Sequence, residues 1–332
     1  MKTQDKVLTL LIEKKGEAVS GESLAEQLSV SRTAIWKSIT CLRDAGYSIK
    51  AVTNKGYILE QEADILKASV IAENLSQEVL ALVGNRIEVF QEIDSTNTEA
   101  KRRASDKSDF ITGSLLLAET QTAGRGRLGR VFYSPKQNGL YMSLLFQPDE
   151  KYVDTSLMTA CAAVAVCRAL EKWNIQSQIK WVNDIFIGNK KVCGILTEGI
   201  MNMEERRMDA VVLGIGINIR QEKTMPEELK NIVGFVKTDE TKESFSRNEL
   251  AAEVMNQVIS IFKEPRKCDL VMEEYKAKSL VMNKVVTVIS LKEPYEAKVI
   301  DITKEGHLIV KTTTGEKKEL LSGEVSIKPE EF

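Results

Sequence analysis

The residues best suited to do chemistry lie in a short stretch rich in arginine and glycine. The stretch ETQTAGRGRLGRVFYSP begins at Glu119 and contains Arg125, Arg127 and Arg130. Each guanidinium is permanently charged and can bind a phosphate or carboxylate through two parallel hydrogen bonds. Three such groups repel one another, and the glycines between them leave the backbone pliable. We therefore predict a lid that becomes ordered when it closes over a polyphosphate or an acyl phosphate, with a solvated basic loop as the alternative.

Two common phosphate-binding motifs do not account for this stretch. G-R-G-R-L-G satisfies the G-x-G-x-x-G pattern, which binds a pyrophosphate at the start of a helix. Here a turn and a strand follow instead, in YSPKQNGLYMSLLF. The Walker A motif also fails, because Arg130 and Val131 follow Gly129 where lysine and then serine or threonine are required.

Residue types for other kinds of catalysis are scarce. The five cysteines are scattered and form no C-x-x-C pair, which indicates neither a disulfide framework nor a zinc site. The single histidine, His307, stands between two strand-like runs, where a turn residue is expected. Catalysis by histidine or by an H-E-x-x-H metal site is therefore disfavoured.

The bulk composition is that of a globular protein with two or three domains. The chain has 332 residues, of which 43% are hydrophobic and 28% charged. No apolar run approaches the roughly 18 residues of a membrane helix, and no targeting segment is recognised, so we expect a cytoplasmic protein. The net charge of −2 excludes a globally basic surface for nucleic acid but leaves room for a local basic face.

The first 62 residues are typical of a winged helix-turn-helix. Their pattern predicts a helix from Lys6 to about Lys15, two short helices capped by Ser23 and Ser31, and a hairpin turning at 53–56. The residues expected to contact DNA are Ser31, Arg32, Thr33, Trp36 and Lys37 on the second short helix, with Lys50 and Lys55 on the wing. A protein-interaction module is the alternative, because the charge excess is slight.

The remaining chain predicts an α+β domain followed by a small β-barrel. After a mainly helical connector up to about Leu82, short apolar strands alternate with helices. Hairpin-like junctions at NGLY and GNKK favour a mixed or antiparallel sheet over a doubly wound one. Four or five short strands at the end predict an SH3-like barrel. We therefore expect domains at 1–62, 63–281 and 282–332.

Five motifs in this order resemble those of biotin protein ligases. They are E-I-D-S-T-N-T, Q-T-A-G-R-G-R-L-G-R, K-W-V-N-D, K-K-V-C-G-I-L-T-E and L-G-I-G-I-N. With the helix-turn-helix in front and SGEVSIK near the end, the whole chain resembles the bifunctional ligases that also repress biotin genes. The resemblance implies a mixed-sheet domain of the biotin/lipoate ligase type, which would bind biotin and ATP and carry out catalysis.

The resemblance also implies a reaction and its partners. Biotin and ATP would form biotinyl-5′-AMP and pyrophosphate, with Mg²⁺ as a further cofactor. The biotinyl group would then pass to a lysine of a biotin carboxyl carrier protein, such as that of acetyl-CoA carboxylase or pyruvate carboxylase. When acceptor is scarce, the adenylate-loaded protein would dimerise and bind operator DNA with an inverted repeat. No membrane partner is implied.

The family's site residues carry over to matching positions of this sequence. Lys191, Arg125, Arg127 and Asp184 would be catalytic, and Asp184 would also hold Mg²⁺ or orient the acceptor lysine. Biotin would be bound by Ser95, Thr96, Asn97, Gln121, Gly124, Arg125 and Lys191. The nucleotide would be bound by Arg127, Arg130, Phe132, Asn183 and Asn218. From the residues alone, S-T-N is also a helix-capping run, and Asp184 could equally cap a turn.

The chain departs from the family's pattern at three positions. Phe132 stands where members usually have a tryptophan that we associate with adenine stacking, so the aromatic face is smaller. Val182 replaces a frequent proline, which should alter local stiffness. Lys328 replaces a frequent arginine, and any bidentate phosphate contact at that position is weakened.

Two other functions are considered. A biotin-sensing repressor without catalysis is the first, but a sensor has no need of Lys191 together with three loop arginines. A lipoate or other acyl ligase is the second, and the arginine-rich loop and the N-terminal module argue against it.

Overall fold

The computed structural model describes twelve segments of the chain. They are residues 2–14, 16–44, 47–53, 55–61, 64–106, 112–147, 155–202, 207–222, 225–238, 245–263, 267–289 and 293–327. The chain divides into two compact units, Met1–Ile65 and Leu66–Phe332. Among the described residues, no helix combines the length and the apolar character needed to cross a bilayer.

The N-terminal unit is the predicted winged helix-turn-helix. Its elements are α1 (Thr3–Glu13), α2 (Gly21–Leu28), α3 (Arg32–Asp44), β1 (Ser48–Val52) and β2 (Gly56–Gln61). The three helices bury a common core, and the two strands pair as an antiparallel hairpin. The predicted cap of α3 is confirmed, since the Ala34 N–H donates to Ser31 Oγ at 3.2 Å. The predicted cap of α2 is wrong: Ser20 caps this helix by accepting the N–H of Ser23 at 3.0 Å, which places Ser23 inside the first turn.

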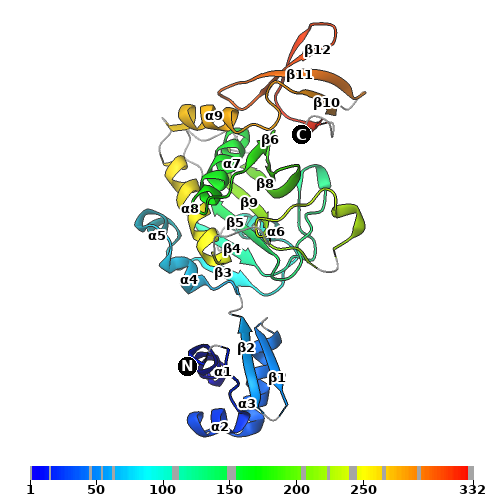
Figure 1. The fold of residues 1–332 in the computed structure, drawn as a ribbon. Coiled ribbons are helices and arrows are strands. Elements are labelled where there is room, and N and C mark those ends of the chain that lie inside the picture. Colours follow the sequence, from blue (N-terminus) through cyan, green and yellow to red (C-terminus); the bar gives the residue numbers. More distant parts are fainter. Residues whose placement is uncertain are drawn as a thin grey trace. The chain divides into compact units, whose positions relative to one another are not determined.

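A mixed sheet of seven strands forms the body of the second unit (Figure 1). Its strands, in spatial order, are β3 (Ile87–Phe90), β4 (Ser114–Ala118), β5 (Gly139–Phe146), β9 (Arg207–Asn218), β8 (Lys190–Asn202), β7 (Asp184–Ile187) and β6 (Gln178–Lys180). Strands β3 and β4 are parallel and all other neighbours are antiparallel. The mixed sheet is as predicted, and GNKK is a hairpin turn. NGLY is not, because β4 and β5 are joined by the long stretch that contains the arginines.

Helices cover both faces of this sheet. The helices are α4 (Ala68–Glu73), α5 (Gln77–Val83), α6 (Thr96–Ser105), α7 (Thr155–Glu171), α8 (Arg247–Phe262) and α9 (Lys267–Ala277), with 3₁₀ turns η1 (Arg127–Gly129) and η2 (Glu227–Leu229). Because side chains alternate along a strand, Leu116 and Val212 face α6, whereas Leu117 and Leu213 face α7 and α8. The face of the sheet that α7 and α8 cover carries the largest cluster of buried hydrophobic side chains. The face on which α6 packs is called the α6 face below.

Five short strands complete the chain, as predicted. They are β10 (Val285–Ile289), β11 (Tyr295–Ile302), β12 (Leu308–Thr312), β13 (Lys317–Leu320) and β14 (Glu324–Ile327). They form an antiparallel sheet in the order β13-β12-β11-β10-β14. Their buried side chains belong to the same core cluster as α7 and α9, and Trp181 Nε1 donates to the carbonyl of Gly306 at 2.9 Å. This sheet is therefore packed on the β6 end of the larger one.

Candidate functional site

One pocket on the α6 face brings together most of the predicted ligand-binding residues. Its lining includes Ser95, Thr96, Asn97, Gln121, Arg125, Arg127, Arg130, Phe132, Asn183, Asp184 and Lys191. These residues come from α6, from the loop between β4 and β5, and from the junctions of β6, β7 and β8. Residues far apart in the sequence thus share one cavity.

Glycines make the floor of this pocket. A Cβ at Gly216 would lie 2.7 Å from the ring of Phe132, and a Cβ at Gly194 would lie 3.2 Å from it. Any larger residue would push the ring away from the sheet. Phe132 also meets Tyr141 edge to face, with ring centroids 6.3 Å apart. The two glycines therefore let an aromatic face lie directly above two strands.

The first turn of α6 presents Ser95, Thr96 and Asn97 at one end of the pocket. Ser95 caps the helix by accepting the N–H of Thr98 at 3.4 Å, so the capping role seen in the sequence is confirmed. The backbone N–H and the hydroxyl of Thr96 both donate to Gln121 Oε1, at 2.9 and 3.2 Å. Ser95 can therefore cap the helix while it also lines the pocket with Thr96 and Asn97.

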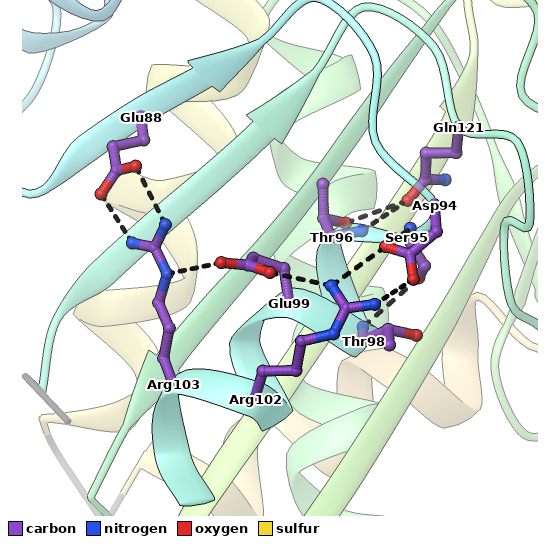
Figure 2. A network of polar contacts seen from close by, with 9 residues as sticks. All are labelled: Glu88, Asp94, Ser95, Thr96, Thr98, Glu99, Arg102, Arg103 and Gln121. Atoms are coloured by element: carbon purple, nitrogen blue, oxygen red, sulfur yellow. Dashed lines mark hydrogen bonds and ion pairs between the residues drawn. The ribbon is translucent and has the colours of Figure 1, made fainter. Parts of the chain in front are cut away.

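Ion pairs outside the pocket hold this turn in place. Figure 2 shows Arg102 between Asp94 and Glu99, and Arg103 between Glu99 and Glu88. Asp94 also accepts the N–H of Ser95 at 2.7 Å. Burial opposes ionisation of Asp94, but the hydrogen bonds from Arg102 and the Ser95 N–H, together with the charge of Arg102, outweigh it and lower the pKa of the carboxyl. The start of α6 is therefore fixed by charge-assisted contacts.

Asn97 is held from three directions. Its Oδ1 accepts the Ser143 hydroxyl at 2.6 Å, and its Nδ2 donates to Glu198 Oε2 at 3.1 Å and to the carbonyl of Leu196 at 3.3 Å. Gly214 lies so close that a Cβ there would be 2.0 Å from Asn97 Oδ1. The amide therefore has a single orientation.

Glu198 connects this polar end to the arginine-rich loop. Lys101 Nζ lies 2.8 Å from Glu198 Oε1, and Arg125 Nη2 lies 3.5 Å from the same oxygen. Burial raises the pKa of Glu198, but hydrogen bonds from Lys101 and Asn97 outweigh burial, so the net pKa is lowered. The carboxylate therefore stays ionised near neutral pH and positions both Asn97 and Arg125.

The other end of the pocket is a set of cations with polar partners. Lys191 Nζ lies 2.7 Å from Asp184 Oδ1, and Arg127 Nη1 donates to Asn183 Oδ1 at 3.2 Å. Arg130 forms a bidentate pair with Glu324 at 2.7 and 2.6 Å, which raises the pKa of the guanidinium. These partners hold apart cations that would otherwise repel one another.

The arginine-rich loop has a defined backbone path. The Gly126 N–H donates to the Arg130 carbonyl at 2.8 Å, and the Phe132 N–H donates to the Gly124 carbonyl at 2.9 Å. Leu128, at φ 55°, turns the chain at the tip and is 76% exposed. A ligand in the pocket would meet both the guanidiniums of this loop and the apolar side chain of Leu128, which also lines the cavity. Ordering of the loop by ligand stays a prediction.

Two predicted residues lie beside the pocket rather than among its lining. Gly124 packs under the loop, where a Cβ would lie 2.4 Å from the Phe132 carbonyl. Asn218 is buried and donates to the Lys191 carbonyl at 3.4 Å, so it supports the strand that carries Lys191. Lys328, the third position that departs from the family's pattern, lies outside the described residues.

Several residues without a predicted role also lie at the site. Ser143 and Glu198 hold Asn97, and Glu324 holds Arg130. Glu198 and Glu324 stand within the motifs K-K-V-C-G-I-L-T-E and SGEVSIK, which was the available signal. Lys180, the first residue of K-W-V-N-D, also lines the pocket.

Carboxylates for a metal ion are few. Within the described part of the chain, no group of three or more His, Cys, Asp or Glu is placed to hold a metal. Asp184 and Glu324 are the acidic residues in the pocket lining. Any cation there would take most of its ligands from a bound phosphate rather than from the protein.

A second concave surface lies in the N-terminal unit, between α3 and the hairpin. Arg32, Thr33, Trp36 and Lys55 line it, and Trp36 is 58% exposed. Lys37 and Lys50 are also exposed, whereas Ser31 serves as the cap of α3. An exposed indole beside arginine and threonine at the start of a helix is suited to contact DNA bases in a major groove.

Comparison with known proteins gives consistent matches along the chain. Residues 89–218 match the Biotin/lipoate A/B protein ligase family, residues 3–58 an HTH domain, and residues 281–328 the Biotin protein ligase C terminal domain. The bifunctional ligase/repressor BirA of Bacillus spizizenii is 35% identical over 94% of this chain and 95% of its own length. BirA of Bacillus subtilis is 41% identical over 68% of each chain.

A solved structure is similar as well. The biotin protein ligase from Aquifex aeolicus in complex with biotin and ATP is 28% identical, with a TM-score of 0.62. The match covers 73% of this chain and 97% of that one.

Proposed function

The chain belongs to the biotin protein ligase family, in its bifunctional ligase/repressor branch, and from this premise we propose its activities. It joins biotin to ATP to form biotinyl-5′-AMP, and it transfers biotin to a lysine of a biotin carboxyl carrier protein. It also represses biotin genes in response to biotin. We assign DNA binding to residues 1–62, catalysis to 63–281 and a C-terminal domain to 282–332.

The observation that best supports ligase activity is the division of one pocket into a polar end and a cationic end. Biotin has a ureido ring that needs hydrogen-bonding partners and an acid chain that needs cations. Ser95, Thr96, Asn97 and Gln121 supply the first set, and Lys191 with the loop arginines supplies the second. The carboxylate of biotin would thus lie among the groups that bind phosphate.

In the first step, a carboxylate oxygen of biotin attacks the α-phosphorus of ATP. The bond to pyrophosphate breaks, and its electron pair leaves with pyrophosphate. Lys191, Arg125 and Arg127 line the same cavity and neutralise the charge that builds up around the phosphorus. Phe132, above Gly194 and Gly216, offers a ring face on which adenine stacks.

In the second step, the amine of the acceptor lysine attacks the acyl carbon and AMP leaves. Asp184 lines the pocket beside Lys191 and orients this amine. Closure of the arginine-rich loop excludes water, which would otherwise hydrolyse the mixed anhydride.

The residues of the pocket could hold Mg²⁺ only together with the phosphates of ATP. Because Asp184 is one of few carboxylates lining the pocket, it would supply one oxygen to an ion that ATP phosphates hold for the most part. When bound, the ion would draw negative charge from the phosphate oxygens. The other charged groups near the phosphates would be the protein cations Lys191, Arg125 and Arg127.

Repression uses the concave surface of the N-terminal unit. Arg32, Thr33 and Trp36 read base edges, and Lys37, Lys50 and Lys55 contact phosphates. A homodimer that forms when the adenylate is bound would place two such units on an inverted repeat.

The test of this function is a biotinylation assay with the purified chain, biotin, ATP and a carrier domain. We expect mass spectrometry to show one biotinyl group on the acceptor lysine, and free biotinyl-5′-AMP when the carrier is left out. Biotin binding without either product would favour the non-catalytic sensor.

A further inference from the structure

Lys180 ends a row of residues that crosses the floor of the pocket. Successive residues of the row lie opposite one another in the ladders from β5 to β6; they are Tyr141, Gly216, Gly194, Asp184 and Lys180. Residues opposite each other point to the same face of a sheet. Since neighbouring strands are about 4.8 Å apart, the Cα of Lys180 stands about 10 Å from that of Gly194. The lysine therefore shares the pocket face with the proposed adenine platform, two strands away.

Lys180 differs from the other cations that line the pocket. Those others each have a polar partner: Arg125 with Glu198, Arg127 with Asn183, Arg130 with Glu324 and Lys191 with Asp184. The backbone of Lys180 pairs with Asp184 in the β6–β7 ladder, but its ammonium makes no hydrogen bond or ion pair to any residue that the structure describes. Among the described residues, the ammonium lies over the ring of Phe186, whose centroid is 5.7 Å from Nζ.

The surroundings of Lys180 favour an incoming anion. Burial lowers the pKa of its ammonium, and the charges of Lys191 and Arg130 act in the same direction. Asp184 and Glu324 oppose them, but each is already paired with another cation. An anion bound at this position would compensate a charge that is removed from water and has no counterion.

A role in packing against Phe186 alone explains the unpaired ammonium of Lys180 less well than anion binding does. Lys237 is a lysine over an aromatic ring elsewhere in this unit, with Nζ 4.1 Å from the Phe245 centroid and a hydrogen bond to the Phe245 carbonyl. Lys180 is farther from its ring, near the limit of about 6 Å for such contacts. Lys180 also lines the pocket, whereas Lys237 does not.

We propose that Lys180 binds the pyrophosphate that ATP releases in the first step. This proposal rests on the ligase function above. As the bond between the α-phosphorus and the bridging oxygen breaks, the electron pair moves to pyrophosphate and its negative charge grows. Lys191 contacts Asp184, and Lys180 lies beyond Asp184 at the β6 edge. With the α-phosphate at Lys191, the β- and γ-phosphates would extend toward Lys180. Its ammonium stabilises the leaving group.

The test measures exchange of labelled pyrophosphate into ATP, with biotin, over a range of pyrophosphate concentrations. Lys180→Met keeps the apolar stem against Phe186 and removes the charge, and Lys180→Arg keeps the charge. We expect Lys180→Met to raise the KM for pyrophosphate at least tenfold, and Lys180→Arg to restore most of the loss. Lys237→Met, which removes a lysine over a ring outside the pocket, should behave like the wild type.

Two further measurements separate this role from a structural one. Calorimetric binding of biotin alone should change less than twofold in Lys180→Met, and so should transfer from synthetic biotinyl-5′-AMP to the carrier domain. Equal losses in exchange, transfer and biotin binding would overturn the proposal, and so would wild-type exchange in Lys180→Met. A wild-type protein that fails to exchange at all would instead contradict the ligase function on which the proposal rests.

Discussion

Replacing Gly214 with alanine should selectively weaken the binding of biotin. The new Cβ would stand 2.0 Å from Asn97 Oδ1 and 2.7 Å from its Cγ, whereas ordinary contact begins at 3.4 Å. Asn97 cannot simply rotate away, because Ser143, Leu196 and Glu198 hold its amide through hydrogen bonds of 2.6, 3.3 and 3.1 Å. The substitution therefore forces the amide out of the position in which it would meet the ureido group.

The size of the effect follows from these contacts. The net contribution of one hydrogen bond is about 1 kcal/mol, so losing two of the three hydrogen bonds of the Asn97 amide costs roughly 2 kcal/mol. Overpacking of a tight site costs about 1–3 kcal/mol, which is a similar amount. Since about 1.4 kcal/mol is a factor of ten in affinity, we expect biotin to bind Gly214→Ala roughly ten to a hundred times more weakly.

The assay is calorimetric titration of biotin in the absence of ATP, after thermal denaturation has shown that the variant is folded. Gly216→Ala is the matched control on the same strand, because its Cβ would meet the ring of Phe132 at 2.7 Å and not Asn97. The control should keep its affinity for biotin and lose affinity for ATP. Unchanged biotin affinity in folded Gly214→Ala, or equal losses in both variants, would refute the assignment of Asn97.

Three further predictions concern other parts of the chain. Trp36→Ala should weaken binding of the DNA upstream of biotin genes about tenfold in gel-shift titrations at fixed salt, while carrier biotinylation stays at the wild-type rate. The lowered pKa of Glu198 means that its carboxylate stabilises the fold above its unfolded pKa of about 4.3 and that this stability is lost as the pH falls through the folded value. The Tm of Glu198→Gln should therefore lie below that of the wild type at pH 7, and the gap should narrow as the pH falls below about 4.3 and through the lower pKa of the folded state. A gap that is constant with pH would contradict the charge argument. Glu119→Ala leaves the guanidinium of Arg247 buried without its carboxylate, which lies 2.8 Å away with both side chains fully buried, so denaturant titration should show a loss of about 3–5 kcal/mol.

The fold could be predicted because its signals are local. Periodic apolar residues and turn residues fixed the helices of the N-terminal unit, the mixed sheet and the five final strands. The cap of α2 was misplaced because Ser20 and Ser23 both precede good helix formers, and only the backbone geometry shows which one accepts the N–H. NGLY was misinterpreted because a turn signal does not show how long the connection is: β4 is the antiparallel neighbour of β5, but it ends at Ala118, and the stretch with the arginines lies between them.

The site residues that lie within the family's motifs could be predicted, whereas most of their supporting residues could not. The resemblance named residues that line the pocket, since each motif carries its own ligand-binding groups. Ser143 lies outside the motifs, and the motif that contains Glu198 does not show its contact, because their partner Asn97 lies 46 and 101 residues away. Contacts at such separations depend on strand register, which a single sequence does not reveal. Arg130 and Glu324, 194 residues apart, are a further example.

The most direct test of the central claim is biotin-dependent exchange of labelled pyrophosphate into ATP by the wild type and by Lys191→Ala. Lys191 contacts Asp184 in the cationic end of the pocket, where the account places the reacting phosphate. We expect exchange in the wild type and a loss of at least about a hundredfold in the variant, because a preorganised cation at the reacting group is removed. Exchange that survives in Lys191→Ala, or no exchange from folded wild-type protein, would contradict adenylation at this site.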